Sequence, residues 1–178
     1  DALRDRSTEL PSLLDLPSSV LTHSGRSSIV LALELLGIGR GDRVLVPTYH
    51  CPTMIAPIER VGAEPSFYRL TSSGTPNLEH LEASLAGRVK AMLVPHLFGI
   101  PADLEDAAKF CRRHDIALIE DCAHCFFGLT GQSPIGTTGA FAIGSLPKFF
   151  PLMVGGILAS ATRSLAASRL RPQSIRHE

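Results

Sequence analysis

The sequence predicts an α/β domain in which helices flank a mainly parallel, mixed β-sheet. Short apolar runs with the length of buried strands alternate along the chain with longer segments of helical pattern. Successive strands that are joined through helices lie parallel, and right-handed connections place the helices on both faces of the sheet. The length of 178 residues, 44% of them apolar and 19% charged, suits one domain with a substantial core.

The helices are delimited by polar caps and by glycines. Residues 1–23 are rich in serine, proline and charged side chains and are expected to form an irregular lead-in to a domain over residues 24–178. Ser27 and Ser28 can cap the first helix, and Gly37 ends it. The helices are expected over residues 29–36, 53–61, 77–85, 102–114 and 163–170.

The strands are expected where apolar residues run continuously over segments too short for a helix. Pro47 closes the first of these runs, and the fourth continues into Glu120 and Asp121. The strands are expected over residues 43–46, 65–69, 89–95, 116–119, 141–143 and 156–159.

Composition excludes several classes of partner. A formal net charge of zero and an aromatic content of 6% without tryptophan argue against binding to nucleic acid or to a membrane surface. No apolar stretch has the length of a membrane span, and no signal-peptide pattern opens the chain. The chain begins at Asp1, so its natural start is expected to be missing. Its four cysteines are expected to be reduced thiols in a cytoplasmic protein.

The candidate site lies where the strands end. Ligands of open parallel sheets bind beyond the carboxyl ends of the strands. Residues 48–51, His96, residues 121–124 and residues 145–148 directly follow predicted strands. These segments also contain the residues whose side chains are best suited to catalysis or ligand binding.

Lys148 is the first candidate. It is one of only three lysines and lies in an apolar loop that ends at two glycines. A lysine desolvated among apolar groups has a lowered pKa and can form a Schiff base as a nucleophile. The alternative is a structural lysine whose amine extends from the loop into water.

Other residues offer complementary groups. Asp121, at a strand end, can pair with a ligand cation such as a pyridinium nitrogen, or can cap a turn. Residues 24–28 (SGRSS) place hydroxyls and helix amides where a phosphate can bind, although serine is ordinary at a helix start. His50 and His96 can contact a ligand ring or serve as structural histidines.

A metal or redox role is disfavoured, and no metal is expected. Cys122 and Cys125 have the CxxC spacing of redox pairs and zinc half-sites, and Cys111 and His114 are possible further ligands. The latter two lie on a predicted helix before the strand, however, and no second CxxC exists. Small buried cysteines around a strand end are the preferred interpretation.

Taken together, these segments resemble the DegT/DnrJ/EryC1/StrS family of pyridoxal-phosphate (PLP)-dependent aminotransferases, of fold type I. The resemblance covers about residues 24–160, with the segments in the family's order. The segments are residues 25–28 (GRSS), 37–47 (GIGRGDRVLVP), 61–65 (VGAEP), 94–103 (VPHLFGIPAD), 119–124 (IEDCAH) and 145–148 (SLPK) with 155–156 (GG).

The resemblance implies roles for individual residues. Lys148 would hold PLP as a Schiff base and move the proton during transfer, and Asp121 would pair with the pyridine nitrogen. His124 would lie near the phenolic oxygen of the cofactor. Ser27, Ser28 and Ser145 would bind the phosphate, and His50 and Cys51 occupy the segment that often supplies a ring-stacking aromatic.

Some positions depart from the family pattern. Cys51 stands at the aligned place of the stacking aromatic, Ala140 replaces an aspartate, Gly144 replaces a larger residue, and Pro147 directly precedes the lysine. Fold type I enzymes also have a small C-terminal domain, which is expected to be missing here, and work as homodimers. The chain is therefore expected to be a fragment or a truncated protein.

The implied function is amino transfer from an amino acid to a nucleotide-linked keto-sugar, in polysaccharide or secondary-metabolite biosynthesis. Family dehydratases commonly carry histidine in place of the lysine, so Lys148 favours transamination. Two alternatives remain open: an inactive remnant or scaffold subunit of the same fold, and a CxxC redox or zinc module.

Overall fold

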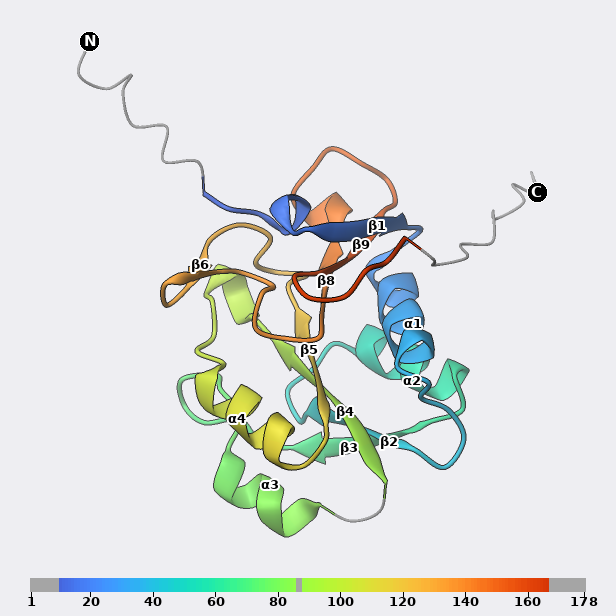
Figure 1. Cartoon of the computed structure of the whole chain (residues 1–178), viewed down its shortest axis with the longest axis vertical. Helices are drawn as coiled ribbons and strands as arrows, with labels where there is room; N and C mark the ends of the chain where they lie inside the picture. Colours follow the sequence, from blue (N-terminus) through green and yellow to red (C-terminus); the bar gives the residue numbers. More distant parts are fainter. Residues whose placement is uncertain (1–9, 86–87, 167–178) are drawn as a thin grey trace.

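The computed structural model describes residues 10–85 and 88–166. Seven strands form one sheet in the order β1-β9-β8-β5-β4-β2-β3 (Figure 1). These strands are β1 (Ser18–Thr22), β2 (Arg43–Pro47), β3 (Glu64–Tyr68), β4 (Val89–Pro95), β5 (Ala117–Asp121), β8 (Phe141–Ser145) and β9 (Gly156–Ser160). A separate two-stranded ribbon pairs β6 (Leu129–Thr130) with β7 (Ser133–Pro134).

The predicted mainly parallel, mixed sheet is confirmed. Strands β3, β2, β4, β5 and β8 pair in parallel, whereas β9 runs antiparallel to both of its neighbours, β8 and β1. The central strands are buried along almost their whole length, which is why each reads as a continuous apolar run. Their carboxyl ends therefore meet at one edge of the sheet.

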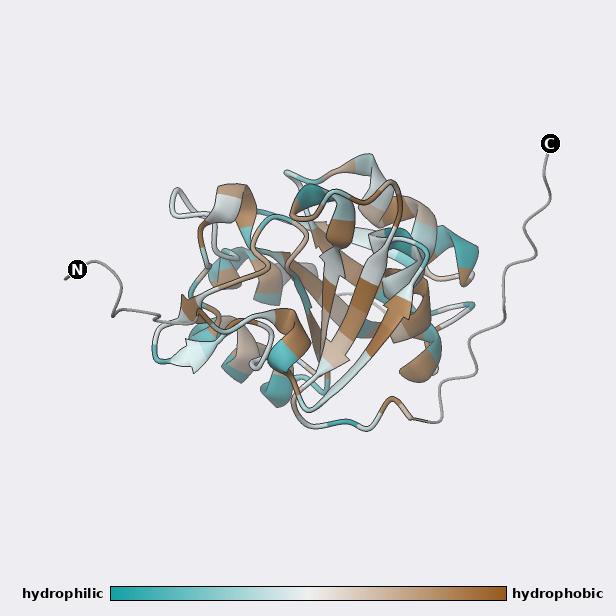
Figure 2. Ribbon diagram, turned by 90° about the horizontal axis from the view of Figure 1, so that it is seen from above, coloured by the Kyte–Doolittle hydropathy of each residue, from teal (hydrophilic) through white to brown (hydrophobic). Residues whose placement is uncertain are grey.

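Helices cover both faces of this sheet. They are α1 (Gly25–Leu35), α2 (Ile55–Arg60), α3 (Leu78–Ser84) and α4 (Glu105–Arg113), with single 3-10 turns η1 (Leu13–Asp15), η2 (Pro52–Met54), η3 (Leu97–Gly99) and η4 (Leu146–Lys148). Residues of α1 and α2 pack with Val44 and Val46 in one core, and residues of α3 and α4 pack with Leu45 in another. This alternation along β2 is expected of a strand with two buried faces. Figure 2 shows the hydrophobic strands enclosed between the helices.

The irregular lead-in predicted for residues 1–23 is corrected in part. Ser18–Thr22 forms the edge strand β1, in which Val20 pairs with Leu158 of β9. Its burial alternates between half-buried and exposed, so its sequence lacks the continuous apolar run of an interior strand. Leu13 is fully buried in a third core cluster, against the loop after β5 and against β8 and β9.

Two predicted helices also differ. The first begins at Gly25, four residues before the expected start, because Ser24 is its N-cap and accepts the Ser27 amide. The helix expected over residues 163–170 is not helical in residues 163–166, and its remainder lies outside the described residues. Within the part that the structure describes, no helix combines the length and apolarity needed to cross a membrane.

Two glycines allow the sheet to pack tightly near the candidate site. Gly144 of β8 leaves room for Leu13 and Ile157, each of which would lie 2.9 Å from an added Cβ, and this explains why a larger residue is absent there. Gly156 of β9 lies against the backbone of Ser24 and Gly25. The start of α1 is thereby held directly against β9.

We expect Gly156→Ala to lower the free energy of unfolding by about 1–3 kcal/mol. The added methyl group would collide with the Ser24 carbonyl and lie 2.6 Å from the Gly25 amide nitrogen, and backbone atoms cannot swing aside. Urea denaturation measures the change. Gly39→Ala is the control, because its Cβ would meet only the Val61 carbonyl oxygen, at 3.5 Å. Equal losses in the two variants would contradict the packing explanation.

Candidate functional site

A cavity of about 560 Å³ lies at the carboxyl ends of β2, β4, β5 and β8 and is closed on one side by the first turn of α1. This is the place at which open α/β sheets bind ligands. Six of the eight predicted site residues line it: Lys148, Asp121, His50, Cys51, His124 and Ser145. These six residues come from three separate segments, each of which lies at or just after the end of a strand.

Ser27 and Ser28, which were predicted to bind the phosphate, are not among the residues that line the cavity. The Ser28 side chain is fully buried, and its hydroxyl lies 2.7 Å from that of Thr22. The half-buried Ser27 hydroxyl contacts the hydroxyl of Ser24 at 3.1 Å. Each residue turns a helix by about 100°, so neighbouring residues of the first turn point in different directions and only some of them face the cavity. Ser24, Gly25 and Arg26 line the cavity instead.

Asp121 is the buried charge of the cavity. Its side chain ends β5 with only 8% of the residue exposed, and one carboxylate oxygen accepts the Ala123 amide at 2.9 Å. Burial is the largest cause and raises the pKa of Asp121, and it outweighs the Ala123 hydrogen bond and the charge of Lys148, which lower it. A carboxylate held at this energetic cost is suited to a cationic ligand group.

Lys148 lies within electrostatic reach of Asp121. It ends η4, directly after β8, and its charge is among the causes that oppose the rise in the pKa of Asp121. The side chain is exposed, so the expected desolvation of the amine is not found in this chain. The segment that follows it is also open to solvent, with Met153 96% exposed. Lys148 and Asp121 nevertheless line the same cavity.

The segment after β2 carries three of the cavity residues. The ring of His50 stacks on Phe67 with 5.3 Å between centroids, and its Nδ1 lies 2.8 Å from the Pro47 carbonyl oxygen. The exposed Cys51 thiol accepts the Thr53 hydroxyl, and hydrogen bonding from Thr53, assisted by the charge of Lys148, lowers the pKa of Cys51. Tyr49 also lines the cavity.

Sequence reasoning missed the aromatic side of the cavity. Phe98 lies in η3, adopts a φ of 56° that bulky residues rarely take, and is 69% exposed. Its ring lies 6.1 Å from that of Tyr49, and both residues line the cavity. Cys51 occupies the expected stacking position, but two other aromatic rings flank the same space.

Burial disfavours a redox or zinc role for the CxxC pair. Cys122 and Cys125 are buried free thiols, and burial raises the pKa of both. The reactive thiolate is therefore disfavoured at each. Cys111, the proposed additional ligand, is also buried, and its pKa is raised to about 12 by burial.

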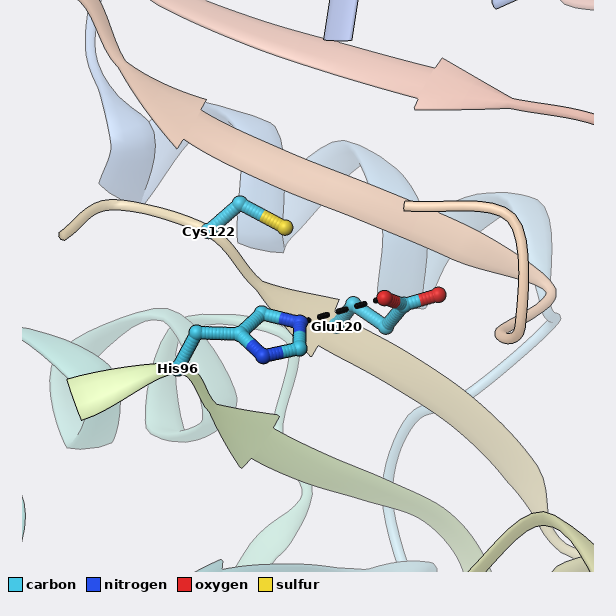
Figure 3. A group of neighbouring side chains, drawn as sticks. All are labelled: His96, Glu120 and Cys122. Carbon is cyan, nitrogen blue, oxygen red and sulfur yellow. Dashed lines mark hydrogen bonds and ion pairs between the residues drawn. The ribbon is translucent and has the colours of Figure 1, made fainter. Parts of the chain in front are cut away.

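Cys122 lies beside His96 and Glu120 in a cluster of potential metal ligands (Figure 3). Glu120 was missed as an important residue because its partners are distant in the sequence. Its carboxylate accepts three backbone amides and a hydrogen bond from His96 at 3.1 Å. The second ring nitrogen of His96 accepts the Ala102 amide. These bonds occupy the His96 and Glu120 groups that a metal would need, so these two residues belong to a hydrogen-bond network.

Comparison with known proteins identifies curated relatives. An aminotransferase from Acidithiobacillus ferrooxidans named for UDP-N-acetyl-3-dehydro-alpha-D-glucosamine is 34% identical over 153 residues, covering 80% of this chain and 38% of the relative. An L-glutamine:scyllo-inosose aminotransferase from Streptomyces griseus is 32% identical over 160 residues, covering 83% of this chain and 36% of the relative. The chain thus spans well under half the length of either protein.

Solved structures share the fold. An aminotransferase from Psychrobacter cryohalolentis has a TM-score of 0.74 and 26% identity, with 84% of this chain and 39% of that chain covered. The aminotransferase TlmJ from Streptoalloteichus hindustanus has a TM-score of 0.72 and 30% identity, with 80% and 40% covered. A sequence profile matches residues 7–166, most of the chain, and the chain therefore belongs to the DegT/DnrJ/EryC1/StrS aminotransferase family.

Proposed function

We propose that the protein is a PLP-dependent aminotransferase that transfers an amino group from an amino acid to a nucleotide-linked keto-sugar. The observation that carries this proposal is that Lys148, Asp121 and the first turn of α1 line one cavity. An amine, a buried carboxylate and a helix N-terminus are three groups that a pyridoxal ring with its phosphate requires.

The groups present fit the cofactor. Asp121 would pair with the protonated ring nitrogen, a cation that compensates the cost of the buried carboxylate. Ser24, Arg26 and Ser145 would bind the phosphate with the amides at the start of α1. This assignment puts Ser24 and Arg26 in the places first given to Ser27 and Ser28.

The remaining residues would serve the transfer itself. When bound, the cofactor supplies an aldehyde and a ring that stabilises negative charge at the amino-bearing carbon. The Nζ of Lys148 would hold the cofactor covalently and then move a proton as a general base and acid. His124 would hydrogen-bond the phenolic oxygen, and Tyr49 and Phe98 would shield the ring side of the cavity from water.

The substrate class comes from the relatives. One is named for a UDP-linked dehydro-glucosamine, and GDP-perosamine synthase from Vibrio cholerae, 28% identical over 133 residues, is named for a GDP-linked sugar. A third is named for L-glutamine and scyllo-inosose. Glutamine or glutamate as donor and a keto-sugar as acceptor are therefore the substrates to test first.

The proposal also covers assembly and location. We infer a homodimer in the cytoplasm, with residues up to Ala166 in the cofactor-binding domain and β1 included in it. Tyr49, Phe98 and Ile100 are at least 60% exposed, and a second subunit would cover such apolar groups. Sedimentation velocity tests the assembly, and a monomer at micromolar concentration would contradict it.

Reduction of the PLP-loaded protein with borohydride should attach the cofactor to Lys148 and to no other lysine. Lys90 and Lys109 are also accessible, with side chains 41% and 53% exposed, but both lie in ion pairs outside the cavity. Peptide mapping by mass spectrometry therefore separates the site from non-specific labelling. Label on Lys90 or Lys109 at the same level as on Lys148, or none on Lys148, would refute the proposed function.

A further inference from the structure

Glu120 is a fully buried carboxylate on β5, the fourth of the seven strands in the sheet order, one residue before Asp121. One of its oxygens accepts the amides of Thr138 and Gly139, each at 2.7 Å. The other accepts the Gly136 amide at 3.1 Å and lies 3.1 Å from Nε2 of His96. Four donors around two oxygens leave no acceptor for a carboxyl proton, so Glu120 is ionised.

The same contacts define the state of His96. Its Nδ1 accepts the Ala102 amide at 2.9 Å and therefore carries no hydrogen. Nε2 then carries the ring hydrogen and donates it to Glu120. Figure 3 marks this contact with a dashed line. His96 is thus a neutral ring with both nitrogens committed, and its hydrogen-bonding groups are not available to a ligand in the cavity that it lines.

The three amide donors belong to the segment that leads into β8. That strand pairs with β5 so that Asp121 lies opposite Ile143, and it continues into Ser145 and η4 with Lys148. Glu120 therefore ties the start of β8 to β5, while its neighbour Asp121 faces the cavity. The position of the lysine relative to the aspartate depends on this register.

We propose that Glu120 is a positioning residue that fixes the β5–β8 register and the neutral His96 ring, and thereby the placement of Lys148 relative to Asp121. This inference rests on the proposed function of the site. It assigns Glu120 no contact with substrate or cofactor. Its effect should therefore appear in turnover and not in the binding of the amino donor.

The test is Glu120→Gln in the intact protein. Glutamine has nearly the same shape but offers one acceptor and one donor group, so at least two of the four donors lose their partner. We expect kcat to fall roughly 10²-fold, as for small displacements of reacting groups, with little change in KM for the amino donor. The pH at which the visible absorbance of bound PLP changes should also shift.

Asp42→Asn is the matched control. Asp42 is another buried carboxylate, 5% exposed, that accepts the Gly39 amide and pairs with Arg88, but it precedes β2 at the end opposite the cavity. The Asp42→Asn variant should be less stable than the wild type. Its kcat, and the pH at which the visible absorbance of bound PLP changes, should stay the same. If Glu120→Gln behaves like this control, Glu120 is only structural and the inference is wrong.

Two further measurements keep the inference testable if Glu120→Gln does not fold. His96→Leu removes one of the four donors and should lower kcat in the same way, by about tenfold. Nitrogen-15 NMR of the cofactor-free protein should show His96 with hydrogen on Nε2 alone, and an Nδ1–H or doubly protonated ring would overturn the inference. Because this spectrum needs no cofactor, failed labelling of Lys148 would refute the proposed function separately.

Discussion

Lys148→Ala should lower kcat by about 10²–10⁴-fold, the range supplied by a positioned proton-transfer group, and should leave the fold intact. The side chain is exposed at the end of η4, so its truncation removes little packing. Steady-state turnover measures the first effect, and thermal unfolding of the cofactor-free protein measures the second. Retention of a tenth of the wild-type kcat would exclude Lys148 as the essential amine.

The Lys148→Arg variant distinguishes the role of the Lys148 amine as a nucleophile from the effect of its positive charge. Hydrogen bonding from Thr53, with the charge of Lys148 as a smaller cause, lowers the pKa of Cys51. Arginine preserves that charge but is not a usable nucleophile, because its guanidinium stays protonated. The pH dependence of Cys51 alkylation should therefore move to higher pH in Lys148→Ala and stay unchanged in Lys148→Arg, although both variants lose turnover.

The parts of the fold that the sequence predicted best are the interior strands. Strands β2, β4, β5 and β8 lie within two residues of their predicted ranges, because burial on both faces leaves an uninterrupted apolar run. The edge strand β1 was missed for the opposite reason. Its residues are half-buried or exposed in turn, and the pattern resembles that of a polar loop.

Site residues at strand ends could be predicted from the sequence. Residues whose place depends on the direction of a side chain on a helix, or on contacts with distant parts of the chain, could not. Asp121 and Lys148 follow apolar strands, so their shared edge follows from the topology. Ser28 lies outside the cavity because the helix begins at Gly25, so that Ser24, Gly25 and Arg26 line the cavity while the Ser28 hydroxyl contacts Thr22. The role of Glu120 cannot be predicted from the residues next to it in the sequence, since its hydrogen-bond donors lie 16–24 residues away.

Asp121→Asn should lower kcat by roughly 10²–10³-fold and, unusually, stabilise the cofactor-free protein by about 1 kcal/mol at pH 7. Asparagine can still accept the Ala123 amide but cannot carry the charge that would pair with the ring nitrogen. Functional sites that hold a charge without a partner commonly lower the free energy of unfolding, so removal of that charge raises it. Turnover and urea denaturation of the same two proteins test both effects.

The pH dependence of that stabilisation follows from the pKa of Asp121, which burial raises above its ordinary value of 3.8. A raised pKa means that the folded state prefers the protonated carboxyl, so wild-type stability is lost as pH rises through the folded-state value. The advantage of Asp121→Asn should therefore be present at pH 7 and disappear below about pH 3.8, where wild-type Asp121 is neutral in both states. Asp106→Asn, at a side chain 80% exposed, should show no such gain. An advantage that persisted in acid would mean that packing, and not the buried charge of the cavity, distinguishes the two proteins.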